Sequence, residues 1–245
     1  TDWLEALNLS IPKTQQELEE VLIAFATKDP DKNGKADTYS ILLTKDSFKQ
    51  SSHADALFYS YKAYPNTWYD DGSGNLVWGG IQPEAKEALA AYKRLYDAGA
   101  INPEFTTIDY SKALEAVIAD KVGMIYEGYY GSGGVLQPHV EATKKTDIWQ
   151  AYPLPSIDGK PVKLHHDTAP YGFHVVRKGY KYPEAAIKML NMWIQEFYIN
   201  TTDWDRYLKL VQNETGTNPK WNLSLCQAYR PLNNINNFRN LERWI

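Results

Sequence analysis

The amino-acid sequence predicts an α/β fold in which helices pack on a mixed sheet. Three observations support this class. Several segments carry apolar residues at helical spacing, short apolar runs typical of strands lie between these segments, and clusters of Gly, Asp and Asn separate the helical segments from the apolar runs. Helices that alternate with short strands are typical of layered α/β folds. A chain of 245 residues, 43% hydrophobic and 23% charged, can bury a sizeable core as one large domain or two small ones.

The first confident elements are a helix and a strand. Thr14 and Glu17 have the spacing of a capping box, in which each side chain bonds the backbone amide of the other. Apolar residues then recur at i, i+3, i+4 and i+7, which predicts a helix that ends near Lys28. The apolar run 39–43 predicts a buried strand, and the weaker pattern of 53–61 predicts a further helical region.

A hairpin and two helices are expected next. Aromatic and branched residues flank a Gly, Asp and Asn cluster between Trp68 and Trp78, which predicts a hairpin with a loop longer than two residues. Pro83 suits the first position of a helix, and an apolar face continues from it until Gly99. Another helix is expected over 110–119.

The second half continues the alternation. A short strand is expected over 122–126, an extended segment over 149–154 and a further strand over 172–176. A helix that begins at Pro183 and a last amphipathic helix over 203–213 complete the predicted elements. No internal repeat or low-complexity tract interrupts them.

The segment after the first predicted helix has the spacing of a calcium loop. Oxygen-bearing side chains occupy relative positions 1, 3, 5 and 9, a glycine occupies position 6, and the carbonyl at position 7 adds another oxygen. The usual Glu at position 12 is replaced by Ser40 and no exiting helix follows, which argues against a calcium-sensing switch. The alternative is a solvated turn, because Asp, Asn and Gly dominate turns. The candidate Ca²⁺ ligands are Asp29, Asp31, Asn33, Lys35 through its carbonyl, and Asp37.

Composition argues against nucleic acid as a partner and against a membrane-spanning segment. The net charge is -4 and no run of Lys and Arg is present, whereas nucleic-acid recognition rests on neutralising phosphates. The longest apolar stretches are only a few residues long. Cys226 is the single cysteine, so an internal disulfide is impossible. The chain begins Thr1-Asp2-Trp3 without a targeting segment, and we therefore expect an excised piece of a longer protein.

The order of several motifs along the chain resembles one family, the carbohydrate-binding extracellular solute-binding proteins (family 1) of bacterial ABC importers. Within this family, the chain resembles the alginate- and oligosaccharide-binding members that carry a calcium loop. The matching segments are Asp2-Trp3-Leu4 with Ile11-Pro12-Lys13-Thr14-Gln15-Gln16-Glu17-Leu18, the loop Lys28 to Asp37, Asp120-Lys121-Val122-Gly123-Met124 with Gly128-Tyr129-Tyr130, and Gly172 to Val176 with Tyr182 to Ala186.

This resemblance implies a periplasmic-binding-protein-like (type II) lobe from an incomplete two-lobe protein. Residues 1–160 would be mostly the second, C-terminal lobe, and residues 161–245 the return crossover with further helices. The start of the N-terminal lobe and the C-terminal end would be absent. The resemblance also implies a structural Ca²⁺ on the Asp29–Asp37 loop, although Thr38 stands where those relatives have Glu.

The implied function is that of a substrate-binding component of an ABC transporter, which captures an oligosaccharide for import without breaking a bond. Its partners would be the carbohydrate ligand and the permease subunits. The implied location is extracellular, as a bacterial cell-surface lipoprotein or a periplasmic protein. Contact with the membrane would be made only through a lipid anchor that this chain lacks.

Aromatic side chains beside polar ones are the candidate sugar contacts, because a flat ring packs on the C–H face of a sugar while polar groups bond its hydroxyls. Flanking glycines favour exposure of the pair that follows the strand over 122–126. For the two Trp of the hairpin, cross-strand packing is the alternative. The candidates are Tyr129, Tyr130 and Glu127, then Trp68, Trp78, and the segment His165-His166-Asp167, of which His166 and Asp167 are the predicted contacts.

Two other functions stay open from the sequence. A glycoside-acting enzyme needs two carboxylates about 5–9.5 Å apart, and Glu127, Asp109, Asp70 and Asp71 supply carboxylates near aromatic residues. A calcium-stabilised protein-interaction module is the third possibility. A transition-metal site at 165–167 is disfavoured, because the chain has only 5 His and no H-x-x-x-H pair.

Overall fold

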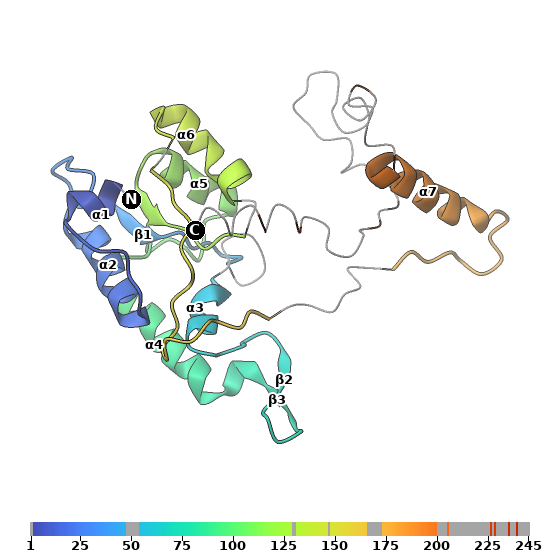
Figure 1. The fold of residues 1–245 in the computed structure, drawn as a ribbon, viewed down its shortest axis with the longest axis horizontal. Coiled ribbons are helices and arrows are strands. Elements are labelled where there is room, and N and C mark those ends of the chain that lie inside the picture. The colour runs from blue at the N-terminus through green and yellow to red at the C-terminus, as the bar shows by residue number, and fades with distance from the viewer. Residues whose placement is uncertain are drawn as a thin grey trace. The chain divides into compact units, whose positions relative to one another are not determined.

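The computed structural model describes residues 2–47, 54–128, 131–146, 148–165 and 173–199, together with residues 205, 226, 228, 235 and 239. The described residues up to 165 belong to one compact unit, and those from 173 to 239 belong to a second (Figure 1). The second unit contains the helix α7 (Glu184–Ile194), which continues as a π-helical turn, η3 (Gln195–Ile199).

The first unit contains both predicted kinds of element. Its helices are α1 (Asp2–Ala6), α2 (Gln15–Thr27), α3 (Asp55–Ser60), α4 (Pro83–Asp97), α5 (Tyr110–Ile118) and α6 (Gln137–Thr143). Its strands are β1 (Tyr39–Ile41), β2 (Trp68–Asp70), β3 (Leu76–Trp78) and β4 (Val122–Met124), with a 3₁₀ turn η1 (Gly79–Ile81) and a π-helical turn η2 (Gly131–Val135).

Helix α2 begins with the capping box that the sequence predicts. The Glu17 amide donates to the Thr14 hydroxyl over 3.2 Å, and the Thr14 amide donates to the Glu17 carboxylate over 3.1 Å. Amides of Lys13 and Thr14 that bond this carboxylate lower the pKa of Glu17. The start of the helix is therefore fixed by its own sequence, and the prediction is confirmed.

The strands form two small sheets. β1 pairs in parallel with β4, with Tyr39 opposite Val122 and Ile41 opposite Met124, and Ile101 adds a parallel bridge to Ile41. A parallel pair needs a crossover, which here contains α3, the hairpin β2–β3, α4 and α5. The antiparallel hairpin is a sheet of its own. Parallel strands covered by helices confirm the α/β class.

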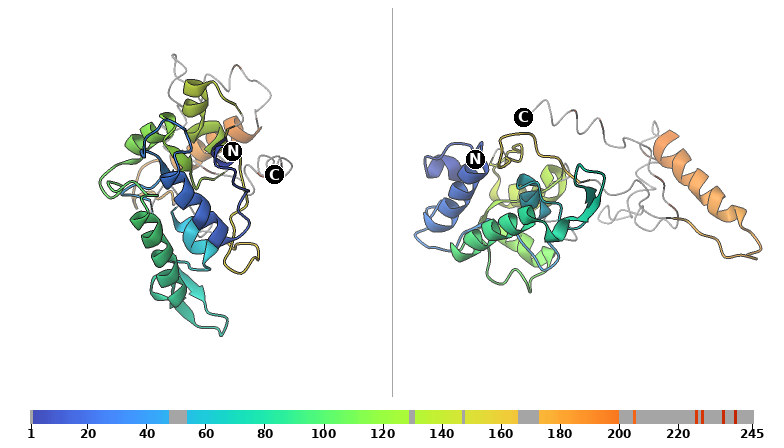
Figure 2. Two further views of the ribbon diagram at one scale, coloured as in Figure 1. Left: turned by 90° about the vertical axis from the view of Figure 1, so that its left-hand side faces the viewer. Right: turned by 90° about the horizontal axis from the view of Figure 1, so that it is seen from below.

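The main core lies where α2, α3 and α4 meet β1. Figures 1 and 2 show α2 and α4 beside each other, and both contact this core. Its most deeply buried aliphatic side chains are Leu22, Ile41, Leu57 and Leu95. Tyr92 reaches through the core, and its hydroxyl donates to the carbonyl of Ala54. This contact anchors α3 to α4 next to the pocket described below.

Some predicted elements differ from those observed. Helices α1 and α6 were not expected, because α1 is only five residues long and α6 carries a proline and few apolar residues. The strand expected over 172–176 is wrong for residues 173–176, which pair with no strand among the described residues, since a strand exists only with a partner. The segment 149–154 is likewise irregular. The helix predicted over 203–213 lies outside the described residues except for Asp205.

Within the described ranges, no helix is both long enough and apolar enough to cross a bilayer. The assignment of residues 1–160 and 161–245 to parts of a two-lobe protein stays a prediction.

Candidate functional site

Aromatic side chains lie on both faces of the hairpin β2–β3, because successive residues along a strand point to opposite faces. Trp68 lies opposite Trp78 across the strands, and their ring centroids are 5.6 Å apart. Tyr69, the next residue along β2, points to the other face of the hairpin. The cross-strand packing expected as an alternative for the two Trp is therefore present, while Trp68 keeps 62% of its surface exposed. Their predicted contact with a ligand stays a prediction.

Three tyrosines form a row on the side of the hairpin that faces α3. The ring of Tyr69 lies 5.3 Å from that of Tyr64, and the ring of Tyr64 lies 5.7 Å from that of Tyr59. Partial burial raises the pKa of Tyr64 and of Tyr69, so both phenols stay neutral hydrogen-bonding groups near neutral pH. The three side chains are partly exposed and combine apolar rings with polar hydroxyls, the residue type that sugar-binding surfaces use.

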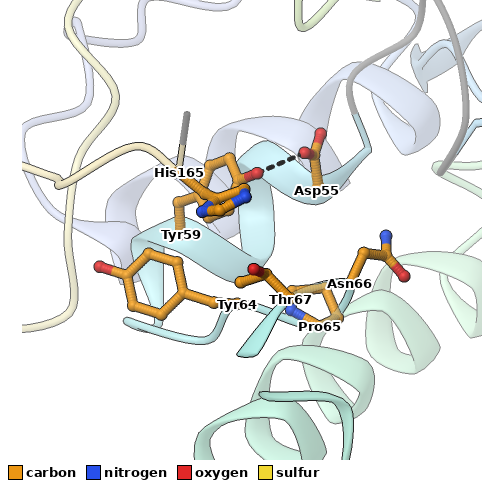
Figure 3. Close-up of a pocket in the computed structure, with 7 residues that line it drawn as sticks. All are labelled: Asp55, Tyr59, Tyr64, Pro65, Asn66, Thr67 and His165. Atoms are coloured by element: carbon orange, nitrogen blue, oxygen red, sulfur yellow. Dashed lines mark hydrogen bonds between the residues drawn. The ribbon is translucent and has the colours of Figure 1, made fainter. Parts of the chain in front are cut away.

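A small pocket opens at one end of this row, between α3 and the loop that leads to β2 (Figure 3). The Tyr59 hydroxyl donates to Oδ2 of Asp55 over 2.6 Å, which fixes both side chains at its rim. Its volume is about 10 Å³, which is room for about one water-sized group. The pocket is lined by Asp55, Tyr59, Tyr64, Pro65, Asn66, Thr67 and His165.

His165 reaches the pocket from a segment far along the chain. Figure 3 shows His165 together with Tyr59 among the residues that line the pocket. The preceding turn is tied down because Lys62 forms an ion pair with Asp158 and the Ile157 amide donates to the Ser60 carbonyl over 2.9 Å. The Lys62 ammonium lowers the pKa of Asp158 to about 2. The structure thus places His165, the first residue of the predicted 165–167 segment, beside the hairpin region.

Glu127 follows β4, which ends at Met124, and it does not line this pocket. The amide of Gly128 donates to its carboxylate over 3.3 Å. Burial, and then the nearby negative charge of Glu127, raise the pKa of Tyr110 to about 12. The predicted contacts Tyr129, Tyr130, His166 and Asp167 lie outside the described residues.

Apart from His165, which belongs to a segment singled out in the sequence, sequence reasoning missed the residues that line the pocket. Asp55 and Tyr59 belong to α3, whose apolar pattern is weak, while Tyr64 and Asn66 lie in a loop without a motif. The signal that could have found them is the density of aromatic residues in 58–69. Their convergence with His165 depends on tertiary packing.

Three of the four carboxylates considered for an enzyme have structural roles. Asp70 and Asp71 accept backbone amides of the hairpin turn, at 2.8 Å from Gly72 and 2.8 Å from Ser73. Asp109 caps α5 by accepting the Lys112 amide over 2.9 Å. Groups bound in this way are not poised for proton transfer. Glu127 alone keeps the placement that the enzyme hypothesis needs.

The Asp29–Asp37 loop is coiled around Asn33. Asp29 accepts the amides of Asn33 and Gly34 at 3.1 and 3.0 Å. The Asn33 side-chain amide donates to Asp31 over 2.6 Å and to Asp37 over 3.0 Å. Gly34 has a φ of 77°, a left-handed conformation that glycine adopts at little cost. The loop therefore gathers oxygen atoms on its inner side.

The charges on this loop are only partly compensated. Partial burial, a hydrogen bond with Asp29 and the negative charges of Asp29 and Asp37 raise the pKa of Asp31. Lys121 bonds Asp37 over 2.8 Å and lowers the pKa of Asp37. Thr38 is buried and its hydroxyl donates to the Phe25 carbonyl over 2.8 Å, so it does not replace the Glu of the relatives.

An oxygen-only donor set with unbalanced negative charge suits a hard cation such as Ca²⁺. In the present geometry, however, the described residues contain no group of three or more His, Cys, Asp and Glu side chains placed to hold a metal ion. Asn33 and Lys121 occupy the carboxylates instead. Binding of Ca²⁺ would require these side chains to turn away.

Comparison with known proteins gives one family for most of the chain. The model of a family described as bacterial extracellular solute-binding protein matches residues 1–196. Lipoprotein LipO of Bacillus subtilis is 38% identical over 128 residues, which are 52% of this chain and 25% of that protein. The polygalacturonan/rhamnogalacturonan-binding protein YtcQ of Bacillus subtilis is 35% identical over 131 residues, which are 52% of this chain and 24% of that protein. The chain thus spans about a quarter of the length of these curated relatives.

Solved structures are also similar to this chain. An extracellular solute-binding protein from Bifidobacterium longum subsp. infantis has a TM-score of 0.51 at 27% identity and covers 63% of this chain and 32% of its own. An HMO-binding, ABC-transporter-associated solute-binding protein from Bifidobacterium longum infantis has a TM-score of 0.52 at 27% identity, with coverage of 63% and 32%. In each case the likeness is to a part of the solved chain.

Proposed function

The chain belongs to the bacterial extracellular solute-binding proteins, and from this we propose that it is part of the substrate-binding component of an ABC transporter, which captures an oligosaccharide for import. The names of YtcQ and of the HMO-binding structure support a carbohydrate ligand. The lipoprotein LipO supports a location at the outer surface of a bacterial cell, with a lipid anchor as the membrane contact. Permease subunits of the transporter are the proposed protein partners.

The observation that carries the proposal is the row of Tyr59, Tyr64 and Tyr69 beside the small polar pocket. A sugar ring that lies on this row places its hydroxyls toward Asp55, Asn66 and His165. Aromatic faces supply apolar contact, and the polar groups set the orientation. Glu127, Tyr129, Tyr130, His166 and Asp167 remain proposed contacts of the same ligand, and Trp68 with Trp78 a further proposed aromatic surface.

The mechanism of this class of protein is capture by closure. A ligand that bridges two lobes stabilises the closed form in proportion to its greater affinity for that form. The closed form is what the permease would recognise. No bond is broken, so the site needs no pair of carboxylates at catalytic separation.

The first prediction concerns Tyr64, which sits in the middle of the row. In an NMR titration with neutral oligosaccharides, the chain is expected to bind with millimolar affinity, because it carries only part of the contacts of its longer relatives. Tyr64→Ala is expected to weaken binding by about tenfold, the effect of losing an aromatic contact. Tyr96→Ala removes an exposed tyrosine of α4 and is the matched control, with unchanged affinity.

An equal loss of affinity in the two variants would contradict the assignment of the row. Hydrolysis of aryl glycosides or oligosaccharides that disappears in Glu127→Gln would replace the binding proposal by a glycoside-acting enzyme. A chain whose stability responds to Ca²⁺, but which shows no response to any sugar, would instead favour a calcium-stabilised module that binds another protein.

A structural Ca²⁺ on the Asp29–Asp37 loop is the second part of the proposal. The ligands would be Asp29, Asp31, Asn33, Asp37 and the carbonyl of Lys35. The ion would neutralise mutually repelling carboxylates and hold the connection between α2 and β1. It would add no chemistry to the sugar site.

The second prediction is that Ca²⁺ raises the melting temperature and that EDTA reverses the rise. Asp31→Asn is expected to abolish the rise without lowering the stability of the metal-free chain. The sign follows from the raised pKa of Asp31, which means that its charged form is disfavoured in the folded state. Ionised Asp31 therefore lowers the free energy of unfolding at pH values above its ordinary pKa, and protonation of Asp31 removes this loss. Asp97→Asn, at an exposed carboxylate of α4, is the control that keeps the full Ca²⁺ response. No shift with Ca²⁺ in the unaltered chain would exclude the metal.

A further inference from the structure

The pocket beside the tyrosine row has an electrostatic character that bears on the kind of sugar bound. Among the lining residues that the structure describes, Asp55 is acidic, His165 is basic, and no Lys or Arg is present. Tyr59 occupies Oδ2 of Asp55, and Oδ1 has no hydrogen-bond partner among the described residues. The pocket therefore presents a carboxylate oxygen that accepts hydrogen bonds.

The positive charge of the neighbouring lysine acts on Tyr64, but its ammonium pairs with a carboxylate other than Asp55. Lys62 is close to the pocket in sequence, but its ammonium is bound to Asp158. Lys62 is not one of the lining residues. An anionic ligand group in the pocket would therefore meet Asp55 without a lysine or arginine in the described lining to pair with it. Binding of carboxylates normally uses such cations, because they form strong charge-assisted hydrogen bonds.

The size of the pocket further restricts which chemical group of the ligand can enter it. About 10 Å³ admits one water-sized group, so a sugar ring stays outside on the tyrosines and only the tip of one substituent, such as a hydroxyl, enters. A neutral hexose carries a hydroxymethyl group at C6, whose hydroxyl can donate to Asp55. A uronic acid carries a carboxylate at the same carbon. Two like charges in such a site cost free energy, whereas the hydroxyl gains a hydrogen bond.

We propose that this pocket takes the terminal hydroxyl of the hydroxymethyl group of a neutral hexose and rejects uronic acids, with Asp55 as the residue that determines this specificity. The inference rests on the proposed function of the same site. It distinguishes this chain from its relative YtcQ, whose name states that it binds polygalacturonan, a polymer of uronic acid.

The test uses pairs of sugars that differ only at C6. The full chain is titrated by NMR with galactose and galacturonic acid, and with glucose and glucuronic acid, up to about 100 mM to cover weak binding. The neutral member of each pair is expected to bind about tenfold more tightly at low ionic strength. The ratio is expected to fall to about threefold or less in high salt, because salt screens the repulsion.

Asp55→Asn is expected to remove most of this ratio, because the amide no longer repels a carboxylate. Asp70→Asn, at the hairpin turn, is the matched control and is expected to keep it. The salt dependence of the unaltered chain tests the same repulsion without any substitution. It keeps the inference testable if Asp55→Asn does not fold.

The outcomes separate the two proposals. Tighter binding of the uronic acids, or a ratio that neither salt nor Asp55→Asn changes, would overturn the role of Asp55 and leave the carbohydrate-binding function standing. Failure of every sugar to bind over the whole range would overturn the proposed function and this inference with it.

Discussion

Replacing Gly79 with alanine is expected to lower the free energy of unfolding by about 3 kcal/mol, at the upper end of the cost of overpacking. A Cβ at this position would stand 1.9 Å from the carbonyl oxygen of Tyr64 and 2.7 Å from its carbonyl carbon. Both obstacles are backbone atoms, so no side chain can rotate away. The amide of Gly79 also donates to the Thr67 carbonyl over 2.9 Å, which holds the two segments together.

The same substitution is expected to abolish sugar binding, because Tyr64 to Thr67 line the pocket. Urea unfolding measures the loss of stability, and the NMR titration measures the loss of binding. Gly128→Ala is the stability control, since its Cβ would meet nothing within 4 Å. A Gly79→Ala chain within about 0.5 kcal/mol of the original, the range of ordinary surface changes, would show that the loop and the hairpin are not packed as described.

His139→Ala is expected to cost a similar amount, about 3 kcal/mol, because it combines a cavity with a broken buried hydrogen bond. His139 is 0% exposed. Its Nδ1 accepts the Trp149 indole N–H over 2.9 Å, and its Nε2 lies 3.3 Å from a carboxylate oxygen of Asp120. It thus joins α6, the segment around Trp149 and the turn before β4.

Two further variants serve as comparisons for His139→Ala, one that removes only its hydrogen bond and one that removes a histidine elsewhere. Trp149→Phe removes the indole donor but keeps an aromatic ring, and a loss of about 1 kcal/mol is expected for the hydrogen bond. His165→Ala removes the pocket histidine and is expected to cost less than about 1 kcal/mol, because that side chain is only partly buried. Equal effects of His139→Ala and His165→Ala on urea unfolding would contradict the central role of His139.

Local chemistry explains which parts of the fold were predictable. The capping box of α2, the turn-rich hairpin and the proline that begins α4 each depend on residues that are close in sequence, and the structure confirms them. The strand expected over 172–176 was not confirmed in its described part, because pairing depends on a partner strand that no local pattern specifies.

The candidate site was predictable only in part for the same reason. Glu127 was found from its place after a buried strand, and Trp68 and Trp78 from the hairpin pattern. Asp55, Tyr59 and His165 come together through the packing of α3 against a segment far along the chain. Nothing in their own sequence neighbourhoods indicates that contact.

The double attachment of Lys121 has a consequence for how this family of sequences can vary. Its carbonyl accepts the Tyr39 amide over 2.7 Å at the first rung of the parallel pair, while its ammonium holds Asp37. Adding or deleting a residue between Asp29 and Asp37 would shift Asp37 relative to Tyr39, so that Lys121 could no longer make both contacts. Natural length variation should therefore accumulate at the tip of the hairpin, where Gly72 and Gly74 face open space, and spare the acidic loop.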